Sequence, residues 1–498
     1  MMISLALILF ATMAQQQSAC EGLKALSLPQ AVITAAEFRP AGAAQAGRGR
    51  GAGAPLPAHC RVAAVLTPSS TSHIEMELWM PVENWNGKFL AVGNGGWAGN
   101  IETGAMGAAL NRGYATASND TGHNRTNGAD GAFALGAPEK VVDFGYRAMH
   151  EMTVQSKALI QSFYKQGPRL SFYQGCSTGG RQGLSEAQRY PEDFDAIIAG
   201  APVYNQTRLH ASQMSLMVEM LKKPEGILSN AKKTTVANAV LGACDQQDGV
   251  KDDIVNNPQM CRFDPAALLC KAGDADSCLT AAQVETAKKA YAPVKLKTGE
   301  LVYPPHSFGF EAGWRMPTAG GTPPNLPGDS FRILGHQDAT WNLNSFELDS
   351  DLALALKNGG NAIDAINPDL SKFKARGGKL LLYHGWADPG PAPENTINYY
   401  DAVNKKLGGT QDDWMRLFLM PGVGHCGGGV GPDQADFLGA LEQWREKGVA
   451  PAQITATRPA GRGGSTPLSR PLCPFPQVAR YKGSGSSNDA ANFSCAAP

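Results

Sequence analysis

The chain has 498 residues, a length that allows a large buried core and favours either several modules or one enlarged domain. Lysine plus arginine and aspartate plus glutamate both number 44, so the formal net charge is zero. This balance, with no long charged run, argues against nucleic acid or a strongly anionic surface as the partner.

The amino terminus carries an apolar run of 11 residues, from Ile3 to Met13, followed by polar residues. Such a run matches the hydrophobic part of a signal peptide and is too short to span a bilayer. We therefore expect residues 1–19 to be a signal peptide and the mature protein to be secreted or periplasmic, without a membrane anchor. The run lacks a preceding Lys or Arg, so a frayed apolar terminus is the alternative.

Ten cysteines are present, and no two of them form a C-x-x-C pair. In a secreted chain this pattern favours disulfide bonds over metal ligation. The number of possible pairings is too large for the spacing alone to define the connectivity.

Strands and turns are expected between about residues 60 and 120, where an apolar strand at 89–92 enters the glycine cluster 93–96. A helix is expected over 141–165, ending before Gly167-Pro168. The chain then predicts a strand at 170–173, a sharp turn at Ser177, a helix at 180–189 and a strand at 194–199. Strands that alternate with helices in this way indicate a parallel sheet.

This alternation stops after Pro202 and returns near residue 379. Residues 205–371 hold four of the ten cysteines and many Gly and Pro residues, which suggests an inserted lid domain. Residues 20–204 and 372–498 would form the two parts of the main domain. The second part predicts a strand at 379–384, a helix at 395–407, a strand at 415–420 and a helix at 433–447 with Gly448 as its C-cap.

The segment Gly175-Cys176-Ser177-Thr178-Gly179 has the G-x-S-x-G pattern of a nucleophile elbow. Small residues on both sides permit a strained turn that exposes a serine hydroxyl after a strand, and a helix follows as that turn requires. We expect Ser177 to be the nucleophile and the amides of Thr178 and of Gly95 or Gly96 to stabilise an oxyanion. Ordinary tight turns are the alternative interpretation of these glycines.

An acid and a base follow the nucleophile in the order typical of an α/β-hydrolase fold. Asp388 comes after the strand that ends at His384, and His425 comes after the next strand. We expect His425 to act as base and then acid, and Asp388 to orient it. His384 is the competing base, although a structural hydrogen bond is the favoured use for a histidine at a strand end.

Cysteines stand directly beside the nucleophile, at Cys176, and beside the histidine, at Cys426. If Ser177 and His425 share a hydrogen bond, their neighbours must also be close. A Cys176–Cys426 disulfide would then fix the pair, whereas two unrelated thiols are the alternative.

Together these elements resemble the tannase and feruloyl esterase family, which also includes the hydrolase of mono(2-hydroxyethyl) terephthalate. The resemblance covers nearly the whole mature chain and rests on the motifs at 93–96, 119–123, 175–181, 384–388 and 424–426. It implies an α/β-hydrolase fold with a large inserted lid domain. It also implies the bridge Cys176–Cys426 together with Cys20–Cys60, Cys244–Cys261, Cys270–Cys278 and Cys473–Cys495.

By the same resemblance, the acidic segment 244–254 implies a structural calcium site in the lid. The side chains of Asp245, Asp248 and Asp252 and the carbonyls of Val250 and Ile254 would be its ligands, all of them hard oxygens of the kind Ca²⁺ prefers. Considered without the family, such a segment is more often a solvated acidic loop.

The family implies a small-molecule ester of an aromatic acid as the substrate: a ferulate, a gallate or a terephthalate derivative. Thr178 is usual for feruloyl esterases, whereas the terephthalate enzyme has Glu after the nucleophile. A serine peptidase and a non-catalytic binding protein on the same fold are the competing functions. Neither the acyl group nor the oligomeric state follows from the sequence. Lid residues that could hold an acyl ring, or equally pack the lid's own core, are Trp314, Phe331, Arg332 and Trp341.

Overall fold

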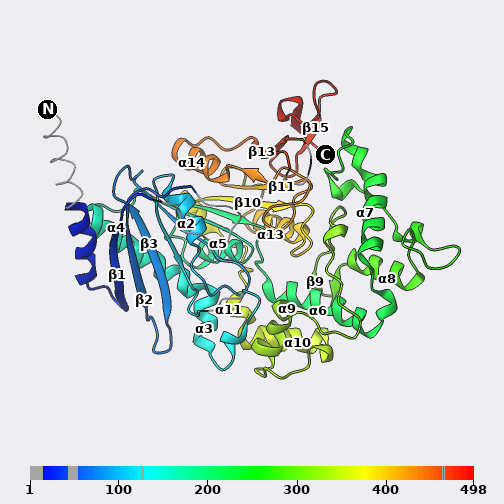
Figure 1. Cartoon of the computed structure of the whole chain (residues 1–498), viewed down its shortest axis with the longest axis horizontal. Helices are drawn as coiled ribbons and strands as arrows, with labels where there is room; N and C mark the ends of the chain where they lie inside the picture. The colour runs from blue at the N-terminus through cyan, green and yellow to red at the C-terminus, as the bar shows by residue number, and fades with distance from the viewer. Residues whose placement is uncertain (1–14, 43–53, 125–127, 462–463, 465) are drawn as a thin grey trace.

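The computed structural model describes residues 15–42, 54–124, 128–461, 464 and 466–498, so most of the predicted signal peptide lies outside the described residues. A nine-stranded sheet crosses the centre of the molecule in the order β1-β2-β3-β5-β4-β6-β7-β10-β11 (Figure 1). The bounds are β1 Ala31–Arg39, β2 His59–Leu66, β3 Ile74–Pro81, β4 Lys88–Val92, β5 Ala115–Asn119, β6 Leu170–Cys176, β7 Ala196–Gly200, β10 Lys379–Gly385 and β11 Met415–Met420.

The sheet has an antiparallel edge and a parallel centre. Strands β1, β2, β3 and β5 pair in antiparallel fashion, whereas β5, β4, β6, β7, β10 and β11 run parallel to one another. Because the carboxyl ends of parallel strands lie at one edge, the loops after β4, β6, β10 and β11 meet there.

Helices cover both faces of this sheet, and the central strands are buried on both sides as parallel strands require. In β4, Phe89 and Ala91 pack into one core while Leu90 and Val92 pack into the other. One face carries α4 (Ala148–Tyr164), α5 (Thr178–Arg189) and α13 (Pro393–Lys406), and the other carries α2 (Thr103–Leu110) and α14 (Phe437–Lys447). No helix of the described residues combines the length and apolar character needed to cross a bilayer.

The segment between β7 and β10 is mainly helical and has two hydrophobic clusters of its own. It occupies the lower and right parts of Figure 1 in green to yellow. Its helices are α6 Gln206–Lys222, α7 Asn230–Cys244, α8 Ala281–Ala290, α9 Asn325–Asp329, α10 Leu348–Ala355, α11 Asn361–Ile363 and α12 Ser371–Ala375, with a small sheet of β8 Val294–Lys295 and β9 Leu301–Tyr303.

The inserted segment contacts the rest of the chain through hydrogen bonds. Trp97 Nε1–H donates to the carbonyl of Leu326 (3.0 Å), and the amide of Gly131 donates to the carboxylate of Asp329 (2.9 Å). The amide of Ala392 donates to the hydroxyl of Tyr303 (3.1 Å), which ties the segment to the loop after Asp388.

Several predicted boundaries move in the structure. The expected helix at 433–447 begins at Phe437, because residues 434–435 pair as β12 with β13 (Ile454–Arg458) and the Asp436 side chain caps the helix by accepting from the Gly439 amide. Gly448 is left-handed with φ 69° and ends the helix, as predicted. A further α-helix is α3 Pro138–Val142, and further strands are β14 Leu468–Leu472, β15 Val478–Tyr481 and β16 Phe493–Ala496.

Candidate active site

Ser177 lies in a strained turn between β6 and α5. Its φ of 65° and ψ of −122° are rarely adopted by residues other than glycine. The Ser177 amide donates to the carbonyl of Gly200 (2.9 Å), which holds the turn in place. The flanking glycines allow this geometry, since a Cβ on Gly175 would lie only 2.6 Å from the backbone of Gly179. The turn therefore has the form of a nucleophile elbow.

Ser177, His425 and Asp388 are joined by two hydrogen bonds. His425 Nδ1 lies 2.6 Å from Asp388 Oδ2, and His425 Nε2 lies 2.9 Å from Ser177 Oγ. A carboxylate can only accept, so Nδ1 carries the ring proton and Nε2 is free to accept from the serine hydroxyl. The loops after β6, β10 and β11 thus bring the three predicted residues together.

The Asp388 carboxylate is buried and fully engaged. Burial alone raises its pKa, but the hydrogen bonds from His384 and His425 outweigh burial and hold the pKa well below its ordinary value. The amide of Gly390 donates to Oδ1 (2.8 Å). The loops that carry Asp388 and His425 also pack closely, since a Cβ on Gly385 would lie 2.2 Å from the carbonyl of Val423.

His384 serves as a structural hydrogen-bonding residue, as its position at a strand end predicts. Its fully buried ring places Nε2 3.1 Å from Asp388 Oδ2 and 3.0 Å from the Pro391 carbonyl. Both partners are acceptors, so Nε2 carries the proton and Nδ1 accepts from the Thr396 hydroxyl (2.7 Å). Ser177 is bonded by His425 and not by His384, which makes His425 the candidate base.

The predicted oxyanion donors, Thr178 and Gly96, lie next to each other. Thr178 opens α5, where amides have no intrahelical acceptor, and its hydroxyl donates to the carbonyl of Gly96 (2.6 Å). Gly96 has φ 57°, and a Cβ there would lie 2.3 Å from the carbonyl of Gly128. The glycine loop after β4 is therefore fixed against the start of the nucleophile helix.

Sequence reasoning missed Gln182 as part of this arrangement. Its Oε1 accepts from the Asn94 amide (3.0 Å) and its Nε2 donates to Asn94 Oδ1 (3.0 Å). Gln182 is four residues after Thr178 and therefore on the same face of α5, a spacing that could have indicated it. This reciprocal pair locks the glycine loop to α5.

The structure contains the bridge Cys176–Cys426, with Cα atoms 5.9 Å apart across 250 residues of chain. This bridge confirms the pairing inferred from the convergence of Ser177 and His425. The four pairings implied by the family are also present, and all ten cysteines are paired.

We expect the double variant Cys176→Ala/Cys426→Ala to lose both stability and rate. Releasing a 250-residue loop costs up to about 5 kcal/mol in the chain-entropy account, and a small displacement of His425 lowers kcat by about 10²-fold. Thermal unfolding and kcat test this. The control Cys473→Ala/Cys495→Ala, which opens a 22-residue separation, should reduce stability without this loss of kcat.

The segment 244–254 has the oxygen donors of a calcium site. Asp245 is buried and accepts from the amides of Asp252 (3.1 Å) and Asp253 (3.2 Å), which curls the loop. Asp252 Oδ1 is buried without a hydrogen-bond partner, while Oδ2 pairs with Arg470. Burial raises the pKa of Asp248 to about 6. At least two of the carboxylates of Asp245, Asp248 and Asp252 lie more than 4.8 Å apart, so the binding of one ion by all three requires the loop to tighten.

Of the four suggested ring-holding residues, Trp314 lines a cavity, and the other three make contacts within the inserted segment. Phe331 packs against Phe346 in the core of the inserted segment, Arg332 pairs with Asp329, and Trp341 stacks on His336. Trp314 borders a partly open cavity of about 120 Å³, whose other lining residues include Met217, Tyr303, Phe310, Arg315 and Pro389.

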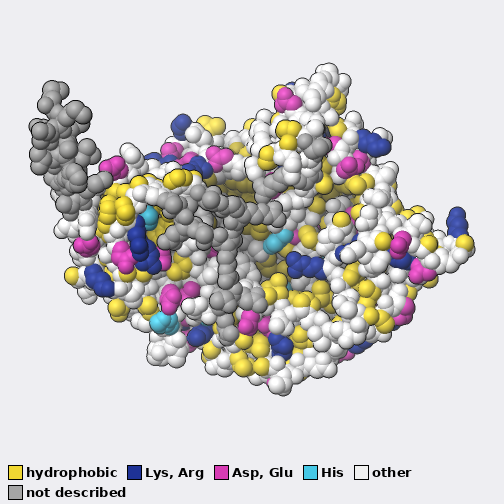
Figure 2. Space-filling model, viewed as in Figure 1, with side chains coloured by type: hydrophobic (Ala, Val, Ile, Leu, Met, Phe, Trp, Pro, Cys, Tyr) yellow, Lys and Arg dark blue, Asp and Glu magenta, His cyan; other side chains and the backbone are white. Residues whose placement is uncertain are grey.

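This cavity borders the loop after Asp388. Pro389 follows Asp388 directly and forms part of the wall. His306 from the inserted segment fixes the same loop, with its Nε2 2.9 Å from the carbonyl of Gly390. In Figure 2 hydrophobic side chains line a hollow at the middle of the face, between the sheet and the inserted segment.

A mixed sheet with this strand order, a nucleophile elbow after β6, and an acid and a histidine after β10 and β11 defines the α/β-hydrolase class. A family profile described as tannase and feruloyl esterase matches residues 60–496. The chain belongs to this family and is a carboxylic ester hydrolase.

Similar proteins agree with this assignment. An uncharacterized esterase of Xanthomonas campestris pv. campestris is 37% identical over 97% of this chain and 92% of that protein, and a probable feruloyl esterase B-2 of Aspergillus terreus is 35% identical over 88% and 86%. The crystal structure of feruloyl esterase B from Aspergillus oryzae covers 97% of this chain and all of that one, with TM-score 0.89 and 32% identity.

A tannin acyl hydrolase from Aspergillus niger has TM-score 0.80 and 22% identity, covering 97% of this chain and 95% of that one. At this identity the likeness shows the shared fold only. Together the neighbours confirm the predicted α/β-hydrolase fold with its large insertion.

Proposed function

We propose that the protein is a secreted serine esterase that hydrolyses esters of aromatic acids through an acyl-enzyme at Ser177. The observation that carries the proposal is the continuous hydrogen-bonded chain from Ser177 Oγ through His425 to Asp388. A serine hydroxyl is a weak nucleophile at neutral pH, and this chain supplies the base that it needs.

In the proposed reaction, Ser177 Oγ attacks the ester carbonyl while His425 Nε2 takes the hydroxyl proton. His425 returns that proton to the leaving alcohol, and a water molecule then releases the acid by the same route. Asp388 keeps the proton on His425 Nδ1 and stabilises the imidazolium. The amides of Thr178 and Gly96 stabilise the negative oxygen that develops on the carbonyl.

An aromatic acyl group is supported by the relatives named feruloyl esterase and by an apolar cavity beside the Asp388 loop. We propose that residues 205–371 act as a lid over the site, since Tyr303 and His306 of this segment bind the loop after Asp388. Trp314 in that cavity is the residue most suited to contact the ring of the acid.

A substrate panel tests the proposed class. We expect measurable turnover of methyl ferulate, methyl gallate or mono(2-hydroxyethyl) terephthalate, and none of peptide p-nitroanilides. Labelling of Ser177 by a fluorophosphonate, located by peptide mass mapping, distinguishes an enzyme from a binding protein. Turnover of the anilides at a higher kcat/KM than the esters would show a peptidase instead.

Secretion is supported by the disulfides, which persist in oxidising compartments. We further propose that Asp245, Asp248 and Asp252, with the carbonyls of Val250 and Ile254, hold a structural calcium ion. The unpartnered oxygen of Asp252 and the desolvated Asp248 fit a hard divalent cation.

Removal of calcium is expected to lower thermal stability. An ion present at 100 times its Kd contributes about 2.7 kcal/mol, so EGTA should lower the Tm and added CaCl₂ should restore it. In Asp248→Asn, whose amide oxygen can still accept from the Val250 amide, the response to calcium should vanish. The exposed control Asp276→Asn should respond like the wild type, and an identical Tm with and without EGTA would contradict the site.

A further inference from the structure

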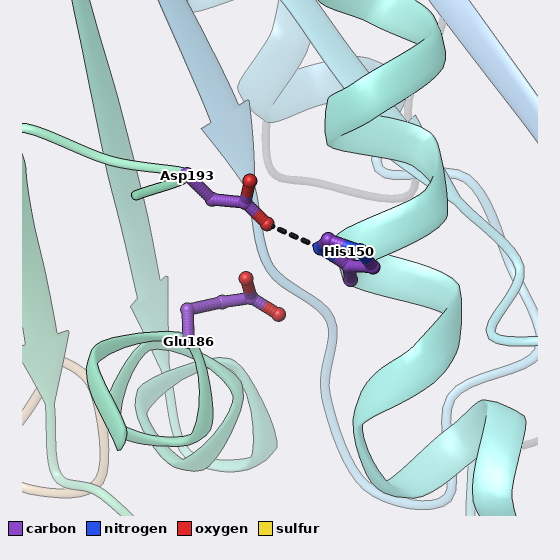
Figure 3. Close-up of side chains that lie close together, drawn as sticks. All are labelled: His150, Glu186 and Asp193. Carbon is purple, nitrogen blue, oxygen red and sulfur yellow. Dashed lines mark hydrogen bonds and ion pairs between the residues drawn. The ribbon is translucent and has the colours of Figure 1, made fainter. Parts of the chain in front are cut away.

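Three side chains from separate elements converge at a place that the esterase chemistry does not use. His150 on α4, Glu186 on α5 and Asp193 in the loop before β7 each offer a ligand atom, and these atoms all lie within 4.8 Å of one another. Figure 3 shows the two carboxylates pointing toward each other and toward the imidazole. Among the residues that the structure describes, no other group of three His, Cys, Asp or Glu side chains meets this criterion.

Glu186 is the unusual member of the group. Its side chain is completely buried, and no donor lies within hydrogen-bond distance of either carboxylate oxygen; burial, together with the adjacent Asp193 carboxyl, raises the pKa of Glu186 well above its ordinary value. An ionised carboxylate in such a place is costly unless a cation or several donors compensate for the lost hydration. The carboxyl of Asp193, only 5% exposed, is among the groups facing Glu186 and adds a second negative charge.

The neighbouring cations do not balance both carboxylates. Lys157 Nζ donates to the carbonyl of Asp193 (2.5 Å) and lies 4.0 Å from Asp193 Oδ1. His150 Nδ1 lies 2.6 Å from Asp193 Oδ2. Both cations make these contacts with Asp193, and neither forms a hydrogen bond or an ion pair with Glu186.

We propose that His150, Glu186 and Asp193 form a binding site for a divalent metal ion of the zinc class. One imidazole nitrogen and two carboxylate oxygens are common zinc ligands, and three protein ligands leave a fourth position for water. Two ligands of one tetrahedral zinc ion lie about 3.4 Å apart, so the His150–Asp193 contact would open by less than about 1 Å.

The surroundings give the ion a route from solvent and place it away from the nucleophile. The His150 ring stacks on Tyr190, with centroids 3.7 Å apart, and its side chain is 23% exposed, which gives the ion a route from solvent. Glu186 lies nine residues after Ser177 on α5, or about 13 Å along the helix axis. Asp193 precedes the amino end of β7, so the ion would fasten α4 to the α5–β7 loop at the edge opposite the nucleophile.

Zinc binding to the full-length protein tests the site. The protein is stripped with EDTA, returned to excess CaCl₂ to occupy the calcium loop, and titrated with ZnCl₂ against a chromogenic chelator. We expect one zinc equivalent in the wild type and in the control Glu151→Gln, which changes a neighbouring α4 residue outside the group. Loss of a residue that only hydrogen-bonds a metal ligand lowers metal affinity by about 10- to 100-fold. Loss of a ligand itself in His150→Gln should therefore weaken zinc binding by about 100-fold or more.

A second variant keeps the result interpretable if His150→Gln fails to fold. Zinc should raise the Tm of the wild type, because it binds the native state. Glu186→Gln replaces the buried acid with a neutral side chain of the same shape, so this variant should fold and show no such rise. Equal zinc affinity in the wild type and in either variant would overturn the proposal. Absence of zinc binding in the wild type would overturn it too, leaving a proton shared between Glu186 and Asp193 as the compensating charge.

Discussion

Ser177→Ala is expected to lower kcat for an aromatic ester by about 10⁵- to 10⁶-fold, because the acyl-enzyme can no longer form. The remaining rate would come from substrate binding and the oxyanion donors alone. Stopped assays at high enzyme concentration with methyl ferulate, or with whichever panel ester is turned over fastest, measure it. The variant should keep the wild-type fold, since the one side-chain hydrogen bond of Ser177 within the described part of the chain is to His425.

The backbone at Ser177 provides a control for this result. A residue other than glycine at φ 65° stores about 1–3 kcal/mol of strain, so Ser177→Gly should be inactive and also more stable than the wild type. Ser350→Ala, at an exposed position of α10, should leave both rate and stability unchanged. Substantial turnover by Ser177→Ala would contradict the assigned nucleophile.

The parallel centre of the fold was predictable because its signals are local. The strand, Gly-flanked turn and helix around Ser177 occur within 20 residues, and the structure places them at β6 and α5. The antiparallel edge was harder to predict. Strand β1 has an irregular exposure pattern and a register shift between Ile33 and Ala35, so its period-2 signal is weak.

The three catalytic residues of the candidate site were predictable from the sequence, but the full set of hydrogen bonds that holds them in place was not. Ser177, Asp388 and His425 stand at strand ends, where chain order and residue type are informative. The supporting contacts of Gln182 and His384 depend on which buried groups need a partner once the loops meet. The Gln182–Asn94 pair joins residues 88 positions apart, so sequence spacing does not indicate Asn94 as the partner, whereas the His384–Asp388 contact spans only four positions.

The group formed by His150, Glu186 and Asp193 illustrates the same limit. These residues are separated by up to 43 positions in an otherwise ordinary stretch of sequence. Their convergence follows from packing α4 beside α5 on one face of the sheet, which is a tertiary event. Only the structure therefore shows that two acids and a histidine share one buried location.

Asp388→Asn is expected to lower kcat by about 10⁴-fold with little change in fold. The carboxylate accepts at Oδ2 from both His384 and His425, and at Oδ1 from the Gly390 amide. An asparagine has one oxygen for these two places. With its NH₂ toward the histidines, His425 Nδ1 must accept, which moves the ring proton to Nε2 and removes the base from Ser177.

In the other orientation the asparagine NH₂ faces the Gly390 N–H, so two donors oppose each other. The imidazolium of His425 still loses its negatively charged partner.

The pH dependence of stability provides a second measurement. Because folding lowers the pKa of Asp388, its ionised form stabilises the native state above the unfolded pKa of about 3.9, and this contribution is lost as the pH falls below that value. Asp388→Asn should therefore lose less stability on acidification below about pH 4 than the exposed control Asp413→Asn does. Near wild-type kcat in Asp388→Asn would show that another group orients His425.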